Sequence, residues 1–324
     1  MTAPAPILVT GASGFIGGRL VAALSARGER VRVATSSPKA FAQADVEIAP
    51  VALNDPDSFA RAAEGCRVVF HAGYAFGRGM AERNVAAARA LAQGALLNRA
   101  ERFVQFSSMV VYGPPSEGAL DERAPTLARD DYARAKLAIE NMLLDLHQEN
   151  ALPATILQPS IVYGPGGTHW TRRPIDDVRR GPVALPAMGL GVCNAVFVED
   201  VVQAALLAAD RPEGVGEMFL ISGAAPVTWL DFYAALSRRV GGHAPVPMAS
   251  EEVEAASLAR YGAHPLLAKL RRRFERADGR MVIPDAGARA LFASHCAIDI
   301  GKARRLLGYA PAFDLARGMA EIAG

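Results

Sequence analysis

The chain has 324 residues, of which 51% are hydrophobic and 21% charged, so it can bury a full core as one large or two interlocked domains. Its formal net charge of +2 provides no basic field of the kind that nucleic-acid binding needs, and no run of 18 apolar residues could span a bilayer. The expected partner is therefore a small molecule, with neither nucleic acid nor membrane. Residues 1–6 lead into an apolar run without a secretory signal, so we expect a cytoplasmic protein.

Cys66, Cys193 and Cys296 lie far apart and have no histidine or cysteine at metal-ligand spacing. We therefore expect no metal site, and we interpret the thiols as buried or unreactive. The sequence also shows no internal repeat and no low-complexity linker.

The first expected strand, Ile7–Thr10, ends in a glycine-rich turn that opens a helix over Phe15–Ala26. Gly11 permits the tight bend, Gly14 allows the backbone to approach a pyrophosphate, and Gly17 allows the helix to pack on the strand. Free N–H groups and the dipole at the helix N-terminus favour an anion there. The pattern predicts a dinucleotide-binding turn.

The end of the second expected strand, over residues 31–35, bears on which dinucleotide binds. A carboxylate there would hold the adenosine ribose of NAD, but no acid is present. The segment offers hydroxyls and a cation instead, at Thr35, Ser36, Ser37 and Lys39. These groups, with Arg32 as a further candidate, suit a 2′-phosphate, so we expect NADP(H) in preference to NAD(H).

Short apolar runs alternate with alanine-rich stretches through the first half, which is the pattern of a parallel sheet with crossover helices. Further strands are expected at Glu47–Val51, Val68–His71, Phe103–Ser107 and Thr155–Gln158. Asp55 before Pro56 predicts an N-cap followed by proline at the first helical position. The predicted fold is α/β, a Rossmann-type doubly wound parallel sheet with a smaller, mostly helical C-terminal domain.

Tyr132 and Lys136 are spaced to share one face of a helix, about 24 residues after the pair Ser107-Ser108. A tyrosine with a reference pKa of about 10 must lose roughly three units to act as a base near pH 7. A nearby ammonium and the positive charge of an oxidised nicotinamide can supply that shift. Together with Ser108 and the glycine turn, this spacing indicates a redox site.

Glycines and prolines after Pro159 mark a loop-rich segment. Strand-like runs at Ala195–Val198 and Glu217–Ile221, with a helix over Val201–Ala209, suggest that the chain then re-enters the first domain. We expect residues 1–166 with about 194–223 to form the dinucleotide-binding domain, and about 167–193 with 224–324 to form the substrate-binding domain. Arg271–Arg273 is interpreted as a solvated helix face, with a diphosphate contact as the alternative.

Several segments, in this order, resemble the extended short-chain dehydrogenase/reductase family of sugar-nucleotide epimerases, dehydratases and related reductases. They are Thr10–Gly17, Val69–Ala72, Asn84-Val85, Phe106–Gly113, Tyr132–Lys136, Gln158–Pro165 and Val196–Asp200. The resemblance implies that Ser108 hydrogen-bonds the substrate oxygen and that Tyr132 is the general acid or base. It also implies that Lys136 lowers the pKa of Tyr132 and binds the nicotinamide ribose.

The resemblance implies two further groups of binding residues. Cofactor contacts are expected at Gly11, Ser13, Gly14, Phe15, Ile16, Gly17, Thr35, Ser36, Ser37, Lys39, Leu53, Ala72, Gly73, Tyr74, Tyr132, Lys136, Pro159, Ile161 and Val162. Substrate contacts are expected at Ser108, Met109, His169, Arg172 and Asn194. His71 is interpreted as structural, and Tyr112 and Tyr163 as packing residues.

Departures from the family's pattern narrow the expected chemistry. Dehydratases carry Asp-Glu after the catalytic hydroxyl and epimerase-reductases carry a cysteine, whereas Met109-Val110 stand here, so neither reaction is expected. The favoured reaction is alcohol–carbonyl interconversion with exchangeable NADP(H). The alternative is 4-epimerisation of a nucleotide sugar through tightly held NAD. A non-catalytic NAD(P)-binding regulator is a second alternative, against which the intact catalytic residues argue.

Single residues and helix faces are the basis for predicting the substrate and the oligomeric state. The arginine that many epimerases use is missing where Gly191–Asn194 stand, although a nucleotide sugar stays a candidate substrate. Tyr74, Met80 and Trp170 come from segments that border the cleft in relatives, and they make a small hydrophobic ketone, or a steroid- or flavonoid-like substrate, an equal candidate. Helices near Asn84–Arg99 and Tyr132–Leu146 have alanine- and leucine-rich faces, so a homodimer is expected.

Overall fold

The computed structural model describes residues 4–41, 45–113, 117–263 and 279–323. Its centre is a parallel sheet of seven strands in the order β12-β7-β5-β4-β1-β2-β3. In chain order these are β1 (Ile7–Thr10), β2 (Val31–Thr35), β3 (Glu47–Pro50), β4 (Val68–His71), β5 (Arg102–Phe106), β7 (Ala154–Pro159) and β12 (Met218–Ile221). The order reverses between β1 and β4, so the predicted doubly wound sheet is confirmed.

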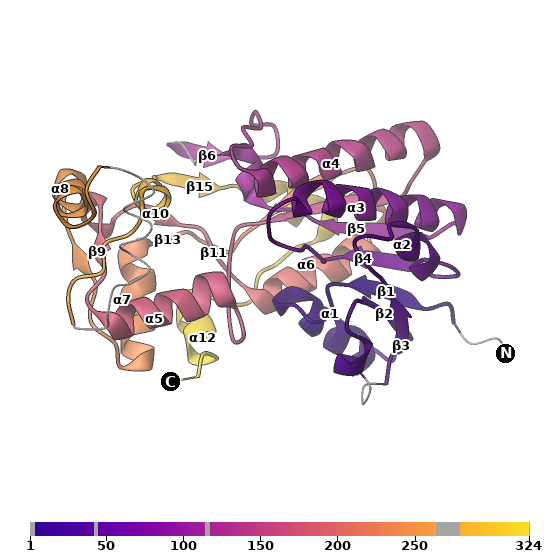
Figure 1. The fold of residues 1–324 in the computed structure, drawn as a ribbon, viewed down its shortest axis with the longest axis horizontal. Coiled ribbons are helices and arrows are strands. Elements are labelled where there is room, and N and C mark those ends of the chain that lie inside the picture. Colours follow the sequence, from indigo (N-terminus) through magenta and orange to yellow (C-terminus); the bar gives the residue numbers. More distant parts are fainter. Residues whose placement is uncertain (1–3, 42–44, 114–116, 264–278, 324) are drawn as a thin grey trace.

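Helices cover both faces of this sheet (Figure 1). One face carries α1 (Phe15–Ala26), α6 (Val198–Asp210) and α11 (Gly301–Leu307), and the other carries α2 (Asp57–Ala62), α3 (Met80–Leu97) and α4 (Asp131–Asn150). Ile7 and Val9 of β1 pack in the first of these cores, whereas Leu8 packs in the second. Because successive side chains alternate across a strand, a sheet buried on both faces requires the continuous apolar run seen here.

A second lobe lies to the left in Figure 1. Its helices are α5 (Arg173–Arg180), α7 (Trp229–Val240), α8 (Ser250–Tyr261), α10 (Ala286–Phe292) and α12 (Leu315–Ala320). Trp229, Phe232 and Phe292 form the centre of its core, and Trp229 and Phe292 have ring centroids 4.2 Å apart. The smaller domain is thus mostly helical, as predicted.

Short elements complete the chain. Pairs of strands join β6 (Gly118–Leu120) to β15 (Cys296–Ile298), β8 (Ile161–Tyr163) to β11 (Ala195–Phe197), β9 (Ala184–Leu185) to β14 (Val246–Pro247), and β10 (Val192–Cys193) to β13 (Val227–Thr228). The short helices are η1 (Pro38–Phe41), η2 (Met109–Tyr112), η3 (Thr168–Arg172), η4 (Ala187–Gly189) and η5 (Pro212–Gly214). No helix among the described residues is long and apolar enough to cross a membrane.

Several predicted bounds differ from the structure by one to three residues, and two of the differences concern the starts of helices. Asp55 does not cap a helix, because α2 begins at Asp57 with Pro56 as its N-cap, and the Asp55 carboxylate pairs with Arg61 at 2.8 Å. Val198 belongs to α6 rather than to the preceding strand.

The chain crosses between the lobes more often than the sequence indicated. The return at Met218–Ile221 joins the main sheet beside β7, but Ala303, Leu307 and Tyr309 also pack in the core of α1 and α6. The predicted division places these three residues in the substrate-binding domain, so it does not include their packing against the first domain. Arg271–Arg273 lies outside the described residues.

Candidate active site

The glycine turn lies at the carboxyl end of β1, where backbone segments approach too closely for side chains. Gly11 has φ +68°, and a Cβ there would lie 2.6 Å from the backbone of Gly73. A Cβ on Gly17 would lie 2.2 Å from the Gly11 carbonyl oxygen. Gly14 is the N-cap of α1 and brings no side chain to cap it, so N–H groups of the first turn are available to an anion. These contacts fit the predicted dinucleotide turn.

A cavity of about 190 Å³ opens beside this turn. Its lining includes seven of the expected cofactor residues, namely Gly11, Ser13, Thr35, Ser36, Leu53, Gly73 and Tyr74. The sequence did not single out the apolar contributions of Ala34, Val51, Phe59 and Ala87. Their mixture of small apolar side chains and hydroxyls fits the adenosine half of a dinucleotide.

The groups at the end of β2 divide into free and occupied ones. Ser36, Ser37 and Lys39 are exposed, whereas the Thr35 hydroxyl accepts a 3.0 Å hydrogen bond from the Ser37 N–H. Arg32 is bound to Glu47 at 2.7 Å and donates to the Ala62 carbonyl at 2.9 Å. Because these partners engage its guanidinium, Arg32 is less available to a 2′-phosphate than exposed Lys39. Its role as a phosphate ligand stays a prediction.

Ser108, Tyr132 and Lys136 meet where β5 ends and α4 begins. Ser108 precedes η2, and its Oγ accepts from the Val110 N–H at 3.4 Å. Lys136 is 3% exposed and donates from Nζ to the Phe106 carbonyl at 2.7 Å. Its Nζ lies 5.7 Å from the centre of the Tyr132 ring. The structure therefore brings the expected catalytic residues together.

Burial moves both titratable groups of this trio toward their neutral forms. It raises the pKa of Tyr132 to about 12, although a hydrogen bond with Ser108 opposes the rise. It lowers the pKa of Lys136 to about 8. The sequence implied that Lys136 would lower the pKa of Tyr132. In the cofactor-free protein the pKa of Tyr132 is raised overall, because removal of the phenol from water has the largest effect. The lowering of this pKa by Lys136 and an oxidised nicotinamide stays a prediction.

An aromatic wall, formed by Tyr74 and Phe76, stands beside Tyr132. The ring centroids of Tyr74 and Tyr132 are 4.8 Å apart, and those of Phe76 and Tyr132 are 5.5 Å apart. Phe76 is nevertheless 77% exposed. Asn84 fixes this loop, because its amide accepts from the Ala75 N–H at 2.9 Å and donates to the Ala75 carbonyl at 2.8 Å. Asn84 was noted in the sequence only as part of a family segment.

The remaining expected cofactor residues lie around the same end of the sheet. Pro159 ends β7, Ile161 and Val162 belong to β8, and Ala72 and Gly73 follow β4. Phe15 and Ile16 open α1 and also pack on the core of the second lobe. His71 is buried, and its Nδ1 lies 2.7 Å from the Thr10 hydroxyl, which fits the structural role assigned to it.

The expected substrate residues do not form one cluster. Met109 is buried with Val111 and Leu120. Asn194 is also buried, and its amide donates to the Cys296 carbonyl and accepts from the Ile298 N–H, both at 2.9 Å. These bonds give Asn194 a structural role in tying β15 to the molecule, which its position in the sequence did not reveal.

His169 and Arg172 lie on η3, and both are exposed. His169 Nδ1 is 3.3 Å from the Arg173 guanidinium. Burial and the Arg173 charge lower the pKa of His169.

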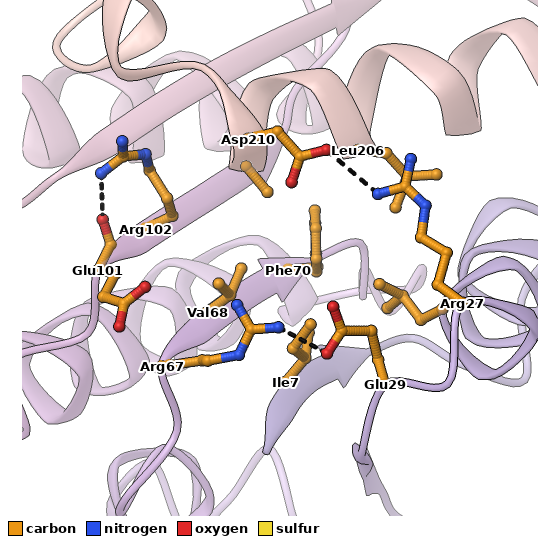
Figure 2. Close-up of a pocket in the computed structure, with 12 residues that line it drawn as sticks. Ile7, Arg27, Glu29, Arg67, Val68, Phe70, Glu101, Arg102, Leu206 and Asp210 are labelled. Atoms are coloured by element: carbon orange, nitrogen blue, oxygen red, sulfur yellow. Dashed lines mark hydrogen bonds and ion pairs between the residues drawn. The ribbon is translucent and has the colours of Figure 1, made fainter. Parts of the chain in front are cut away.

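A second cavity, of about 260 Å³, lies at the amino ends of the strands (Figure 2). Four of its charged side chains form two ion pairs: Arg27 pairs with Asp210 at 3.2 Å, and Arg67 pairs with Glu29 at 2.6 Å. Ligands of open α/β sheets bind outside the carboxyl ends of the strands, so the opposite cavity with Tyr74 is the better candidate site.

The fold and the site define a dinucleotide-binding enzyme of the short-chain dehydrogenase/reductase type. The family model described as "NAD dependent epimerase/dehydratase family" matches residues 7–222, about two thirds of the chain, so the protein belongs to that family. Members of this class are NAD(P)-dependent oxidoreductases and epimerases, which confirms the enzyme class expected from the resemblance.

Curated relatives match different shares of the chain. The protein is 33% identical over 235 residues to sterol demethylase protein B from Methylococcus capsulatus, covering 67% of this chain and 69% of that protein. It is 25% identical over 340 residues to a 3 beta-hydroxysteroid dehydrogenase/Delta 5-->4-isomerase from Mycobacterium tuberculosis, covering 97% and 88%. The chain also matches another curated relative, of whose length it spans about half, 54%.

Among solved structures, the fold is similar to that of UDP-glucuronic acid 4-epimerase from Bacillus cereus in complex with NAD, with a TM-score of 0.74 and 20% identity. The match covers 98% of this chain and 97% of that one.

Proposed function

We propose that the protein interconverts a ketone and a secondary alcohol with NADP(H), and that Ser108, Tyr132 and Lys136 are its catalytic residues. The observation that carries this proposal is the trio at the end of β5, in which buried Lys136 lies beside partly buried Ser108 and Tyr132 and the pKa of Tyr132 is about 12. A neutral phenol near pH 7 is the form that donates a proton, so the site suits carbonyl reduction.

In the reduction, Ser108 and Tyr132 hydrogen-bond the carbonyl oxygen, and Tyr132 gives it a proton. NADPH, when bound, supplies the hydride. Lys136, charged below a pKa of about 8, stabilises the phenolate that the transfer leaves behind and binds the ribose. The cofactor contacts expected from the sequence, from Gly11 to Val162, are part of the same proposal.

The aromatic wall supports an apolar, ring-shaped substrate. Phe76 exposes most of a large apolar side chain within 5.5 Å of the Tyr132 ring centre, where a flat hydrocarbon ring would cover it. Two of the relatives have sterol or steroid names, which supports the same class. A nucleotide sugar would need cations for its diphosphate, for which exposed Arg172 is a candidate.

Exposed Ser36, Ser37 and Lys39 support NADP(H) over NAD(H). Because Glu47 engages Arg32, Lys39 is the main candidate cation for the 2′-phosphate. Lys39→Ala is therefore expected to weaken NADPH binding about tenfold and to leave NADH binding unchanged, measured by fluorescence titration. Equal losses for both cofactors would contradict this assignment.

The function is tested by NADPH oxidation with a panel of apolar cyclic ketones. Tyr132→Phe should lower the rate on the active ketones by about 10²–10⁴-fold and keep NADPH binding. The matched control, Tyr233→Phe in the core of the second lobe, should retain the rate. No turnover of ketones or sugar nucleotides despite NADPH binding would favour a non-catalytic regulator.

The 4-epimerase alternative is separated by the cofactor that the purified protein carries. Release of stoichiometric NAD on denaturation would favour the epimerase, because its NAD is regenerated in each cycle. Protein that releases no NAD and binds added NADPH would favour the reductase.

We also propose that the protein is a homodimer formed through the exposed faces of α3 and α4. Leu91 and Ala95 of α3 face the core, whereas Ala86 and Ala138 lie on the exposed faces of α3 and α4. Light scattering should give a dimer mass that Ala138→Arg reduces to that of a monomer. A monomer at micromolar concentration would overturn the proposal.

A further inference from the structure

Glu140 lies one helical turn beyond Lys136 on α4, and the two side chains are among the most buried charged groups described. Glu140 is 1% exposed and Lys136 is 3% exposed. Residues four apart on a helix are neighbours on one face. A buried carboxylate is costly unless it is paired and hydrogen-bonded, yet the proposed proton transfer gives Glu140 no task.

Hydrogen bonds fix the side chain of Glu140 in place. Gln158 on β7 donates from Nε2 to Glu140 Oε1 at 2.9 Å. Tyr112 on η2 donates to Gln158 Oε1 at 2.8 Å. Because the Tyr112 hydroxyl occupies the amide oxygen, the amide must turn its N–H toward Glu140. That orientation favours an ionised carboxylate, which only accepts hydrogen bonds.

Among the described residues, the other groups that contact Lys136 carry no negative charge. Its Nζ donates to the Phe106 carbonyl on β5 and faces the neutral rings of Tyr74 and Tyr132, at 5.1 and 5.7 Å. His71 on β4 is uncharged, because burial and the Lys136 charge lower its pKa to about 3.

Glu140 thus supplies the opposing charge. Burial lowers the pKa of Lys136 to about 8, and Glu140 acts against that fall. Burial in turn raises the pKa of the Glu140 carboxyl, which its hydrogen bonds and the Lys136 charge oppose.

We propose that Glu140 is a positioning residue: held by the Tyr112–Gln158 pair, it acts as the buried counter-charge that keeps Lys136 an ammonium ion at working pH. The inference rests on the proposed function for its benefit to catalysis, since a neutral Lys136 could not stabilise the Tyr132 phenolate. The effect of the Glu140 charge on the protonation of Lys136 requires neither substrate nor cofactor.

The test is an NMR titration of protein labelled with ¹³C at lysine Cε, because the chain has only four lysines. Lys136→Arg identifies the signal of Lys136. Glu140→Gln keeps the shape of the side chain and removes its charge, and it should lower the titration midpoint of Lys136 by about one pH unit or more. Tyr112→Phe frees the Gln158 amide to turn, so it should produce a smaller fall.

Glu149→Gln, on the exposed end of the same helix, is the matched control and should leave the midpoint unchanged. A Lys136 midpoint in folded Glu140→Gln within about 0.2 pH units of that in the unmodified protein, which is the precision of such a titration, would overturn the inference. If Glu140→Gln does not fold, an unchanged midpoint in Tyr112→Phe overturns it instead. The titration needs no turnover, so a protein without reductase activity would contradict the proposed function and leave this test intact.

Discussion

At the scale of single residues, burial sets the protonation of the site. Tyr132 and Lys136 both leave water, and removal from water penalises whichever form is charged. The pKa of the phenol therefore rises to about 12 while that of the ammonium falls to about 8. Near pH 7 the pair is a neutral proton donor beside a cation, which is the state that carbonyl reduction needs.

The pH dependence of reduction follows from Lys136. Its pKa is lowered, so the ammonium is present below about 8 and is lost as the pH rises through that value. Since Tyr132 keeps its proton to higher pH, we expect kcat/KM for ketone reduction to fall above about pH 8. A pH profile at saturating NADPH measures this, and a rate that stays level to pH 10 would contradict the role of Lys136.

At the scale of elements, α1 can pack closely on the turn that follows β1 because Gly17 has no side chain. The Gly11 carbonyl occupies the space that a Cβ on Gly17 would need, with 2.2 Å between them. Backbone atoms cannot rotate away as a flexible side chain can. The position of the helix N-terminus, and with it the anion site, therefore depends on this glycine.

Gly17→Ala should push α1 away from the turn, destabilise the protein by about 1–3 kcal/mol and weaken NADPH binding. Urea unfolding and fluorescence titration measure the two effects. Gly287→Ala is the control, because Gly287 lies in α10 with its nearest neighbour, Asp285 Oδ1, at 3.5 Å. It should retain NADPH binding, and a loss as large as that of Gly17→Ala would contradict the role of the turn.

Element prediction succeeded where the local pattern was strong. The strands at Ile7–Thr10 and Val68–His71 and the helix at Phe15–Ala26 have the predicted bounds, because apolar runs end there in glycine-rich or polar turns. The cap at Asp55 was misplaced, because Pro56 is itself the N-cap and Asp55 pairs with Arg61 instead.

At the scale of the whole molecule, Asp200 joins the start of α6 to the C-terminal segment. Its carboxylate accepts from the Ala312 N–H at 2.7 Å and from the Phe313 N–H at 3.2 Å. Phe313 also stacks on Phe197, with ring centroids 4.3 Å apart. The chain is thus fixed to the first lobe just before α12 packs on α7 in the second lobe.

Asp200→Asn should cost about 1–3 kcal/mol, because an amide of the same shape presents N–H to one of two backbone donors. Thermal or urea unfolding measures the loss. The control is Glu199→Gln, because Glu199 is exposed, whereas Asp314 near the same segment caps α12. Glu199 pairs with Arg19 at the surface, and its loss should cost less than about 1 kcal/mol. Equal losses would argue against a special role for Asp200.

The sequence alone determined the doubly wound sheet, the glycine turn and the Ser108, Tyr132 and Lys136 pattern, because each depends on residues that are local or at a fixed helical spacing. Tertiary structure decided which polar groups are free. Arg32 and Asn194 look available in the sequence, yet Glu47 holds one and the backbone of β15 holds the other. It also decided the direction of the Tyr132 pKa shift. Desolvation depends on every segment that covers the side chain, and a local sequence pattern does not show which segments those are.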